Sequence, residues 1–297
     1  MKLGIPSKKV LITGIDGFTG IYLKQHMLSL GYQVFGTVRG TPDTPEQFQM
    51  ELTDPRSIER VLNTIKPDYI VHLAAISFVG HDDTADFYRI NVIGTENLLQ
   101  GIINADLAPE KVLIASSANV YGNSRKTLIS EDTPCEPVNH YACSKLAMEK
   151  IVANYFDKLN IIITRPFNYT GPGQAEHFLV PKIVTHFKRN AQAIELGNLD
   201  VSRDYSSVVN VVDAYEKLLV SPTVHTIVNV CSGVSVSLLE IVDTMKELTQ
   251  QKMAVKVNQN FVRKDEIKTI TGDNSKLVSI IGTRTNQSLS QLLESFI

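Results

Sequence analysis

The sequence has 297 residues, 43% of them hydrophobic and 20% charged, an ordinary composition for a packed globular protein. Its 29 basic and 31 acidic side chains give a formal net charge of −2, which leaves no basic excess for a nucleic-acid backbone. The amino-terminal residues do not resemble a signal peptide, and the longest apolar runs are far too short to span a bilayer. Scattered histidines form no metal-ligand cluster, and three cysteines without CxxC spacing predict reduced thiols in a cytoplasmic protein: Cys135, Cys143 and Cys231.

The first part of the chain alternates short apolar strands with helices. The predicted strands are 9–13, 33–38, 69–73, 111–116 and 160–165, and the predicted helices are 21–31, 54–65, 86–104 and 141–156. Asp54 and Pro55 are expected to cap and to begin the second of these helices. This alternation predicts an α/β fold with a doubly wound parallel sheet that is covered on both faces.

Beyond residue 165 the alternation loosens. A helix is expected near 180–190, a strand near 194–196, a strand in TIVNVCSG, a helix in LLEIVDTMKELTQ and a short strand at 254–257. We therefore predict a nucleotide-binding domain at 1–168 that also receives roughly 205–232, and a smaller substrate-binding lobe made mainly of 169–297.

A glycine-rich turn directly follows the first predicted strand and opens the first helix. Its three glycines at spacing i, i+3 and i+6 allow a tight turn, close approach of a pyrophosphate and close packing of helix on strand. The helix amino terminus then offers N–H groups and a positive dipole end to phosphate. The turn predicts a dinucleotide site with contacts from Gly14, Asp16, Gly17, Phe18, Thr19 and Gly20.

The residue after the second strand discriminates between NAD and NADP through the ribose 2′ position. Arg39 stands there, and an arginine pairs with a 2′-phosphate that an acidic residue would repel. Asp54 resembles an acidic residue that contacts the adenine amino group, and it is equally explained as a helix cap. Small residues at the carboxyl end of a later strand let the cofactor lie close: Leu73, Ala74 and Ala75. The expected cofactor is NADP(H).

Tyr141 and Lys145 are four residues apart and so share one face of a predicted helix. A lysine ammonium near a phenol favours the phenolate and lowers the tyrosine pKa, which makes Tyr141 a proton donor and acceptor near neutral pH. Ser117, at the end of the preceding strand, can hydrogen-bond the same carbonyl or hydroxyl oxygen. These three residues predict a catalytic site for hydride transfer at a carbonyl carbon.

The chain resembles the extended short-chain dehydrogenase/reductase family along nearly its whole length. The resemblance rests on the glycine turn and on the motifs HLAA, NVIGTEN, SSANVYG, YACSK, RPFNYTGPGQ and RDYSSVVNVVDA. It implies a Rossmann domain with a C-terminal sugar-nucleotide lobe. It also implies that Asn91 supports the catalytic helix, that Lys145 contacts the nicotinamide ribose and that Pro166 lies near the nicotinamide. Members commonly pair through two long helices, which leads us to expect a homodimer.

The reaction is narrowed by the two residues after Ser117. Dehydratases of this family carry an acid–base carboxylate there, whereas this chain has Ala118 and Asn119, which cannot do that work. The stretch RPFNYTGPGQ most resembles the reductases of GDP-4-keto-6-deoxy-D-mannose, with Tyr169 in place of their histidine. The expected activity is NADPH-dependent reduction of the C4 keto group of a GDP-4-keto-6-deoxy hexose or heptose.

By the same resemblance, Arg203 and Arg263 match the arginines that hold the nucleotide sugar, and Asn168 matches an asparagine that contacts its diphosphate or sugar. Lys182 is a further candidate, equally explained as a solvated helix charge. Other activities stay open. They are a 4-epimerase with tightly bound NAD(P), a C3/C5 epimerase-reductase using His81 or Cys143, and a non-catalytic NADP-binding protein on this fold.

Overall fold

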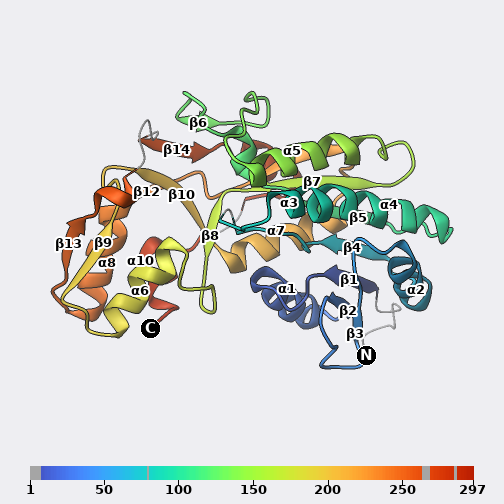
Figure 1. Ribbon diagram of the computed structural model, residues 1–297, viewed down its shortest axis with the longest axis horizontal. Coiled ribbons are helices and arrows are strands. Elements are labelled where there is room, and N and C mark those ends of the chain that lie inside the picture. The colour runs from blue at the N-terminus through green and yellow to red at the C-terminus, as the bar shows by residue number, and fades with distance from the viewer. Residues whose placement is uncertain (1–7, 79, 263–267, 284–285) are drawn as a thin grey trace. The chain divides into compact units, whose positions relative to one another are not determined.

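The computed structural model describes residues 8–78, 80–262, 268–283 and 286–297 (Figure 1). The chain divides into two compact units. The first holds the chain up to Gly122 together with Cys135–Arg165 and Val212–Val228. The second holds Asn123–Pro134, Pro166–Val211 and Asn229–Ile297.

A seven-stranded sheet in the order β11-β7-β5-β4-β1-β2-β3 organises the first unit. Pairing is parallel from β3 through to β7, with Thr13 beside Thr37 on one side and beside His72 on the other. The predicted parallel α/β sheet is therefore confirmed. Its strands are β1 (Lys9–Thr13), β2 (Gln33–Val38), β3 (Gln47–Gln49), β4 (Tyr69–His72), β5 (Lys111–Ala115), β7 (Ile161–Pro166) and β11 (Thr226–Val230).

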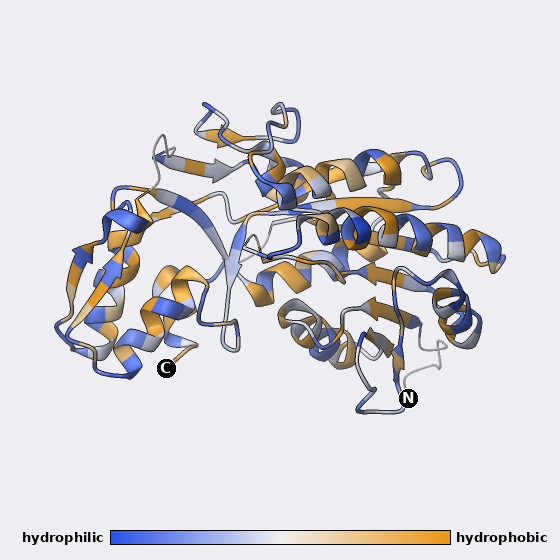
Figure 2. Ribbon diagram, viewed as in Figure 1, coloured by the Kyte–Doolittle hydropathy of each residue, from blue (hydrophilic) through white to orange (hydrophobic). Residues whose placement is uncertain are grey.

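Helices cover both faces of this sheet (Figure 1), and Figure 2 shows that the strands of the sheet are largely hydrophobic. The helices α2 (Pro55–Ile65), α4 (Thr95–Asn104) and α5 (His140–Ala153) enclose one core with the sheet, and α1 (Phe18–Ser29) and α7 (Val208–Val220) lie on the other face. Every second strand residue points into the first core, as the period-two alternation of a strand requires. Its fully buried members include Leu11, Ile70, Val112, Leu98 and Ile102.

Most predicted elements are found within a few residues, and the helix expected at 86–104 is present, but it is not a regular α-helix throughout. The helical segment consists of α3 (Thr84–Tyr88), a π-helical turn η1 (Arg89–Gly94) and α4. The Thr95 hydroxyl donates to the Asn91 carbonyl oxygen at 2.7 Å, the oxygen that an α-helix would give to the Thr95 N–H. Asn91, which lies in this turn, is fully buried.

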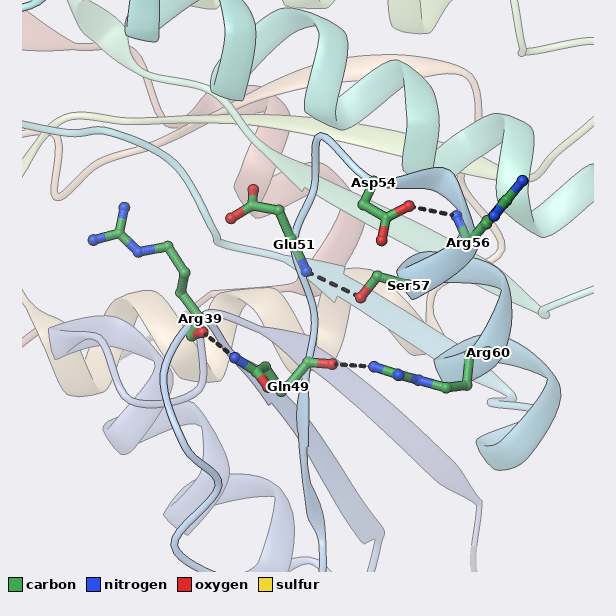
Figure 3. Close-up of a pocket in the computed structure, with 7 residues that line it drawn as sticks. All are labelled: Arg39, Gln49, Glu51, Asp54, Arg56, Ser57 and Arg60. Atoms are coloured by element: carbon green, nitrogen blue, oxygen red, sulfur yellow. Dashed lines mark hydrogen bonds between the residues drawn. The ribbon is translucent and has the colours of Figure 1, made fainter.

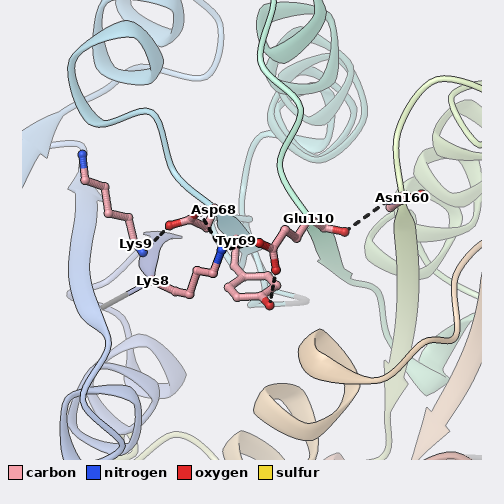
Figure 4. Close-up of polar contacts among 6 residues, drawn as sticks. All are labelled: Lys8, Lys9, Asp68, Tyr69, Glu110 and Asn160. Carbon is pink, nitrogen blue, oxygen red and sulfur yellow. Dashed lines mark hydrogen bonds and ion pairs between the residues drawn. The ribbon is translucent and has the colours of Figure 1, made fainter. Parts of the chain in front are cut away.

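The amino edge of the sheet carries a cluster of polar contacts (Figure 4). The Tyr69 hydroxyl donates to Glu110 at 2.6 Å, and Glu110 also pairs with Lys8. Asp68 accepts the backbone N–H of Lys9 at 2.7 Å, and Asn160 donates to the Glu110 carbonyl oxygen at 3.3 Å. Burial and the hydrogen bond to Glu110 raise the pKa of Tyr69. The cluster joins the loops at the edge opposite the glycine turn.

The second unit is built on short strands. One sheet has the order β12-β10-β14-β6, with β8 also pairing with β10, and β13 pairs with β9. The strands are β6 (Leu128–Ile129), β8 (Asn168–Thr170), β9 (Ala193–Leu196), β10 (Ser202–Ser207), β12 (Ser235–Ser237), β13 (Ala254–Val257) and β14 (Thr269–Gly272).

The core of the second unit lies between its helices and β9. Its fully buried side chains are Ile183, Phe187, Val242, Met245 and Leu293. The remaining helices are α6 (Leu179–Lys188), α8 (Leu238–Thr249), α9 (Ser275–Ile281), α10 (Leu289–Glu294) and two 3₁₀ turns, η2 (Ala118–Tyr121, in the first unit) and η3 (Gln259–Phe261). Among the described residues, no helix is long and apolar enough to cross a membrane, and no His, Cys, Asp or Glu group could hold a metal ion.

Candidate active site

The carboxyl ends of β1, β2, β4 and β5 meet at one edge of the first unit's sheet because these strands run parallel. The glycine turn follows β1, Arg39 follows β2, Leu73–Ala75 follow β4 and Ser116–Ser117 follow β5. This edge is where open α/β sheets bind their ligands. The structure therefore brings the first unit's predicted site segments to one place.

The glycine turn leaves no room for side chains at two of its positions. Gly14 has φ +69°, a left-handed conformation, and a Cβ there would lie 3.1 Å from backbone atoms of Ala74. A Cβ on Gly20 would lie 2.3 Å from the Gly14 carbonyl oxygen, so helix α1 packs directly against the turn. Gly17 is the N-cap of α1, where no described side chain caps the helix. The turn has the shape that a pyrophosphate requires at a helix amino terminus.

A cavity of about 440 Å³ lies beyond the ends of β2 and β3 (Figure 3). The exposed Arg39 side chain lines it, and the Arg39 carbonyl oxygen accepts from Gln49 at 3.1 Å. Arg60 reaches back from α2 and donates to the Gln49 carbonyl oxygen, also at 3.1 Å. The other lining residues are Glu51, Asp54, Arg56 and Ser57. Arg39 and Arg60 make this cavity suited to an anionic group, whereas the Arg56 side chain points away from them in Figure 3.

The acidic residues of this cavity differ in what their side chains do. Asp54 accepts the backbone N–H of Arg56 at 3.1 Å and Pro55 begins α2, which confirms the predicted cap. Glu51 projects to the same side as Arg39 in Figure 3, while accepting from Thr53 at 3.2 Å. Glu51 and Arg60 were not predicted from the sequence. The three-residue strand β3 is too short to show a hydrophobic pattern, so the wall of the cavity that follows it was not expected.

Tyr141 and Lys145 lie on the buried face of α5, with 8% and 5% of their surfaces exposed. Asn139 begins this helix by accepting the N–H of Ala142 at 2.9 Å. The Lys145 ammonium donates to the Ala115 carbonyl oxygen at 2.8 Å, so it is anchored at the end of β5. Burial lowers the pKa of Lys145 to about 8, although the negative charge of Glu149 acts to raise it. Lys145 is therefore still mainly cationic at neutral pH.

Ser117 lies two residues beyond the Lys145 anchor and is 8% exposed. Its hydroxyl oxygen accepts the N–H of Asn119 at 3.1 Å and so caps the turn η2. The preceding Ser116 donates to Glu149 of α5 at 2.5 Å. Helix α5 is thus fixed to Ala115 and Ser116, the two residues that precede Ser117. The predicted catalytic residues Ser117 and Lys145 therefore lie at the same end of β5.

A buried ion pair that sequence reasoning missed holds this arrangement together. Glu149 accepts from Arg165 Nε at 2.9 Å and from Arg165 Nη2 at 2.6 Å, with 2% and 5% of the two side chains exposed. Arg165 also donates to the Tyr121 hydroxyl at 3.0 Å. Glu149 follows Lys145 by four residues, and this helical spacing was the signal that could have found it.

The second unit holds the residues expected to bind the nucleotide sugar. Asn168 is exposed on β8 and pairs with Tyr205 of β10, two residues after Arg203. Lys182 donates to the Glu195 carbonyl oxygen at 3.0 Å and lies 4.7 Å from the centre of the Phe261 ring, which favours its structural interpretation. Arg263 lies outside the described residues. Pro166 is the last residue of β7.

Known proteins resemble the chain over almost its full length. Residues 11–296 match the family described as GDP-mannose 4,6 dehydratase. GDP-6-deoxy-D-talose 4-dehydrogenase of Aggregatibacter actinomycetemcomitans is 41% identical, covering 92% of this chain and 91% of that protein. GDP-6-deoxy-D-mannose reductase of Pseudomonas aeruginosa is 28% identical, covering 98% and 96%. The structure of RMD from Pseudomonas aeruginosa complexed with NADPH has a TM-score of 0.87 at 27% identity, covering 97% of each chain.

The Rossmann-like sheet, the glycine turn and the Ser-Tyr-Lys site define an extended short-chain dehydrogenase/reductase. Within that class, the chain belongs to the GDP-mannose 4,6-dehydratase-like family. The resemblance read from the motifs is thereby confirmed.

Proposed function

We propose that the chain is an NADP(H)-dependent oxidoreductase that reduces the C4 keto group of a GDP-4-keto-6-deoxy sugar. The sugar is a hexose such as GDP-4-keto-6-deoxymannose, or a heptose. The observation that carries this proposal is the buried Tyr141 and Lys145 at the end of β5, beside a Ser117 segment that continues with Ala118 and Asn119. Those two side chains cannot exchange protons with a sugar carbon, so the site supports carbonyl reduction rather than dehydration.

When bound, the nicotinamide supplies the hydride. Tyr141 donates its phenolic proton to the alkoxide that develops on the C4 oxygen, a role that contributes about 10²- to 10⁴-fold in rate. Lys145, held against Ala115, stabilises the phenolate left on Tyr141. The Ser117 hydroxyl hydrogen-bonds the same C4 oxygen and stabilises its developing charge. The buried position of Tyr141 and Lys145 strengthens these electrostatic effects, because little water screens them.

The names of two relatives bear on the product. One is a 4-dehydrogenase of GDP-6-deoxy-D-talose and the other a GDP-6-deoxy-D-mannose reductase. These two sugars differ only in configuration at C4, so one 4-keto compound yields either of them by hydride delivery to one face or the other. The higher identity to the first relative favours the talo product, and the same site can run in the oxidative direction. The proton coupling between C3 and C4 of the product distinguishes the two configurations.

NADP(H) is the proposed cofactor because Arg39 and Arg60 line the cavity beyond β2 and β3. We assign the ribose 2′-phosphate to Arg39 and a hydrogen bond from the adenine amino group to the Glu51 carboxylate. Replacing Arg39 with Asp should lower kcat/KM for NADPH roughly 10- to 150-fold, since a charged hydrogen bond is lost and repulsion is added. The value for NADH should change little. A loss that is equal for both cofactors would contradict the assignment.

In the second unit, Arg203 and Asn168 are the proposed contacts to the GDP diphosphate and sugar, together with Arg263. Lys182 is proposed as a weaker contributor, because its ammonium already contacts Glu195. A homodimer and a cytoplasmic location belong to the same proposal. Light scattering at micromolar concentration tests the dimer, and a monomeric mass would contradict it.

The direct test mixes the purified protein with NADPH and GDP-4-keto-6-deoxy-D-mannose and follows NADPH absorbance, with Tyr141→Phe as the matched variant. Oxidation of NADPH that depends on Tyr141 and yields a reduced GDP sugar supports the proposal. No oxidation with this hexose or with its heptose analogue contradicts it. Tightly retained NAD, with interconversion of two sugar epimers, would instead identify an epimerase.

A further inference from the structure

A continuous chain of buried hydrogen bonds begins at Thr13, the last residue before the glycine turn. The Thr13 hydroxyl oxygen accepts the N–H groups of Leu73 and Ala74, both at 3.1 Å. It also lies 2.7 Å from Nδ1 of His72, its neighbour across the β1–β4 pair. On the other side of the ring, His72 Nε2 lies 2.9 Å from the Thr95 hydroxyl oxygen. Thr13, His72 and Thr95 are all buried, at 0%, 2% and 1% exposure.

The partners fix where each proton in this chain lies. A carbonyl oxygen can only accept, so Thr95 must donate its single hydroxyl proton to Asn91, at 2.7 Å. Thr95 therefore accepts from His72, which places a proton on Nε2. Thr13 then donates its own proton to the unprotonated Nδ1. One state satisfies every group, the neutral ring with hydrogen on Nε2, and burial agrees, since it lowers the pKa of His72 to about 3.

The chain continues from Asn91 to the catalytic helix. The Asn91 side-chain oxygen accepts the N–H of Ile76 at 2.8 Å, and its nitrogen donates to the Ile76 carbonyl oxygen at 3.1 Å and to Ser144 at 3.0 Å. Ser144 in turn donates to the Tyr141 carbonyl oxygen at 2.8 Å. The start of the loop after β4 is consequently held by Thr13 at Leu73 and Ala74, and by Asn91 at Ile76. One network joins the cofactor-side loop to the backbone of Tyr141.

We propose that His72 is a positioning residue that fixes the β4 loop and the Tyr141 helix relative to each other through this network. The inference rests on the proposed function, because it assigns the loop to the cofactor and Tyr141 to proton transfer. A neutral His72 makes one acceptor and one donor contact in fixed directions, which holds Thr13 and Thr95 at a set separation. Loss of that constraint leaves both groups present but misplaced, and a displacement of about 1 Å can cost roughly 100-fold in rate.

Thr95→Val tests the proposal because it removes the hydroxyl and keeps the volume of the side chain. The matched control is Thr249→Val in α8, which loses the same kind of bond to its own helix, also at 2.7 Å. We expect Thr95→Val to lower kcat about 10- to 100-fold. A role in stability alone would lower Tm in both variants and leave kcat unchanged well below Tm, and that result would overturn the proposal.

Substitutions of His72 separate the two arms of the network. His72→Phe keeps an aromatic ring without hydrogen bonds, His72→Gln keeps a donor toward Thr95, and His72→Asn keeps an acceptor toward Thr13. Partial recovery of kcat in Gln or Asn relative to Phe supports positioning through these bonds. Equal kcat in all three and in wild type would overturn it. If the Phe variant does not fold, Thr95→Val still decides the question.

Uniform ¹⁵N labelling of the protein gives a readout that needs no substrate. The ¹⁵N spectrum of the wild type with NADP⁺ should show His72 neutral with its proton on Nε2 at pH 7, and the Thr95→Val variant should shift the amide signals of both Leu73 and Tyr141. A protonated ring, a proton on Nδ1, or shifts confined to the turn around Thr95 would overturn the proposal. If the wild type fails to reduce the GDP-keto sugar, the proposed function fails while these spectra still decide the network.

Discussion

The buried pair of Glu149 and Arg165 allows one quantitative prediction. Replacing Glu149 with Gln keeps the shape of the side chain but removes its charge, and leaves a guanidinium that is 95% buried without its counter-ion. Burial alone would lower the pKa of Arg165, yet its hydrogen bonds and charge pairing with Glu149 raise it, so the guanidinium is cationic in the folded protein. Breaking one side of such a pair costs about 3–5 kcal/mol of unfolding free energy. We expect a loss in that range.

The same chain contains a control pair of the same chemistry. Glu176 accepts from Arg189 at 3.1 Å, but 59% and 67% of these side chains are exposed. Glu176→Gln should therefore change the free energy of unfolding by no more than about 1 kcal/mol. Urea titrations of wild type and both variants at pH 7, with equal m-values, give the comparison.

The double variant Glu149→Leu with Arg165→Met separates charge burial from packing. It should recover much of the stability lost in Glu149→Gln, because two apolar side chains replace a desolvated pair. The reductase activity of the double variant should be lower than that of wild type, because Ser116 and Tyr121 lose the contacts that hold the Ser117 segment. If Glu149→Gln costs less than about 1 kcal/mol, like its exposed control, then the pair does not carry the uncompensated charge that we infer.

Other predictions follow from buried groups. Burial lowers the pKa of His72 to about 3 in the folded protein, against 6.5 in the unfolded chain. The stability that neutral His72 gives to the fold is therefore complete above pH 6.5 and is lost as the pH falls. Wild type should lose about 2 kcal/mol more stability between pH 6.5 and 5 than His72→Phe does, by urea unfolding. Lys111 donates to the Leu218 and Thr223 carbonyl oxygens at 3.1 and 2.8 Å, so Lys111→Met should cost about 1–3 kcal/mol in the same assay. Because the pKa of Lys145 is about 8, kcat should fall above that pH as its charge is lost; a flat kcat profile to pH 10 would contradict this role.

Elements with strong local signals could be predicted from the sequence. The strands β1 and β2 have the predicted bounds, because each is an apolar run next to a glycine or turn residue. The start of α2 was equally predictable, since Asp54 and Pro55 are a cap and a first residue by their own chemistry. The glycine turn, Ser117, Tyr141 and Lys145 could be proposed as site residues from the sequence, because their residue types and spacing suit the chemistry that they would perform.

Features set by distant contacts could not be predicted. Nothing local marks the π-helical turn at Arg89–Gly94, which is accompanied by a side-chain bond from Thr95 to Asn91. The short strands β3 and β6 have three and two residues, too few for a hydrophobic period to appear. The burial of Asp204 likewise depends on residues that are distant in the sequence. Its carboxylate is 1% exposed and accepts from Ser232 at 2.6 Å and from the Gly272 N–H at 3.2 Å, partners 28 and 68 residues away.

The comparison between family and site shows where function is decided on this fold. The chain matches a family described by a dehydratase activity, yet the positions after Ser117 hold an alanine and an exposed asparagine. The supports of the site are nevertheless complete, since Ser116 is held by Glu149 and Lys145 by Ala115. The proposed carbonyl reduction uses the bound nicotinamide, Ser117, Tyr141 and Lys145, whereas loss of water from the sugar would need a further acid–base group. A protein of this fold that has the residues for carbonyl reduction but lacks the additional acid–base group can reduce a carbonyl and cannot eliminate water. The side chains of the site, rather than the fold, therefore determine the proposed reaction.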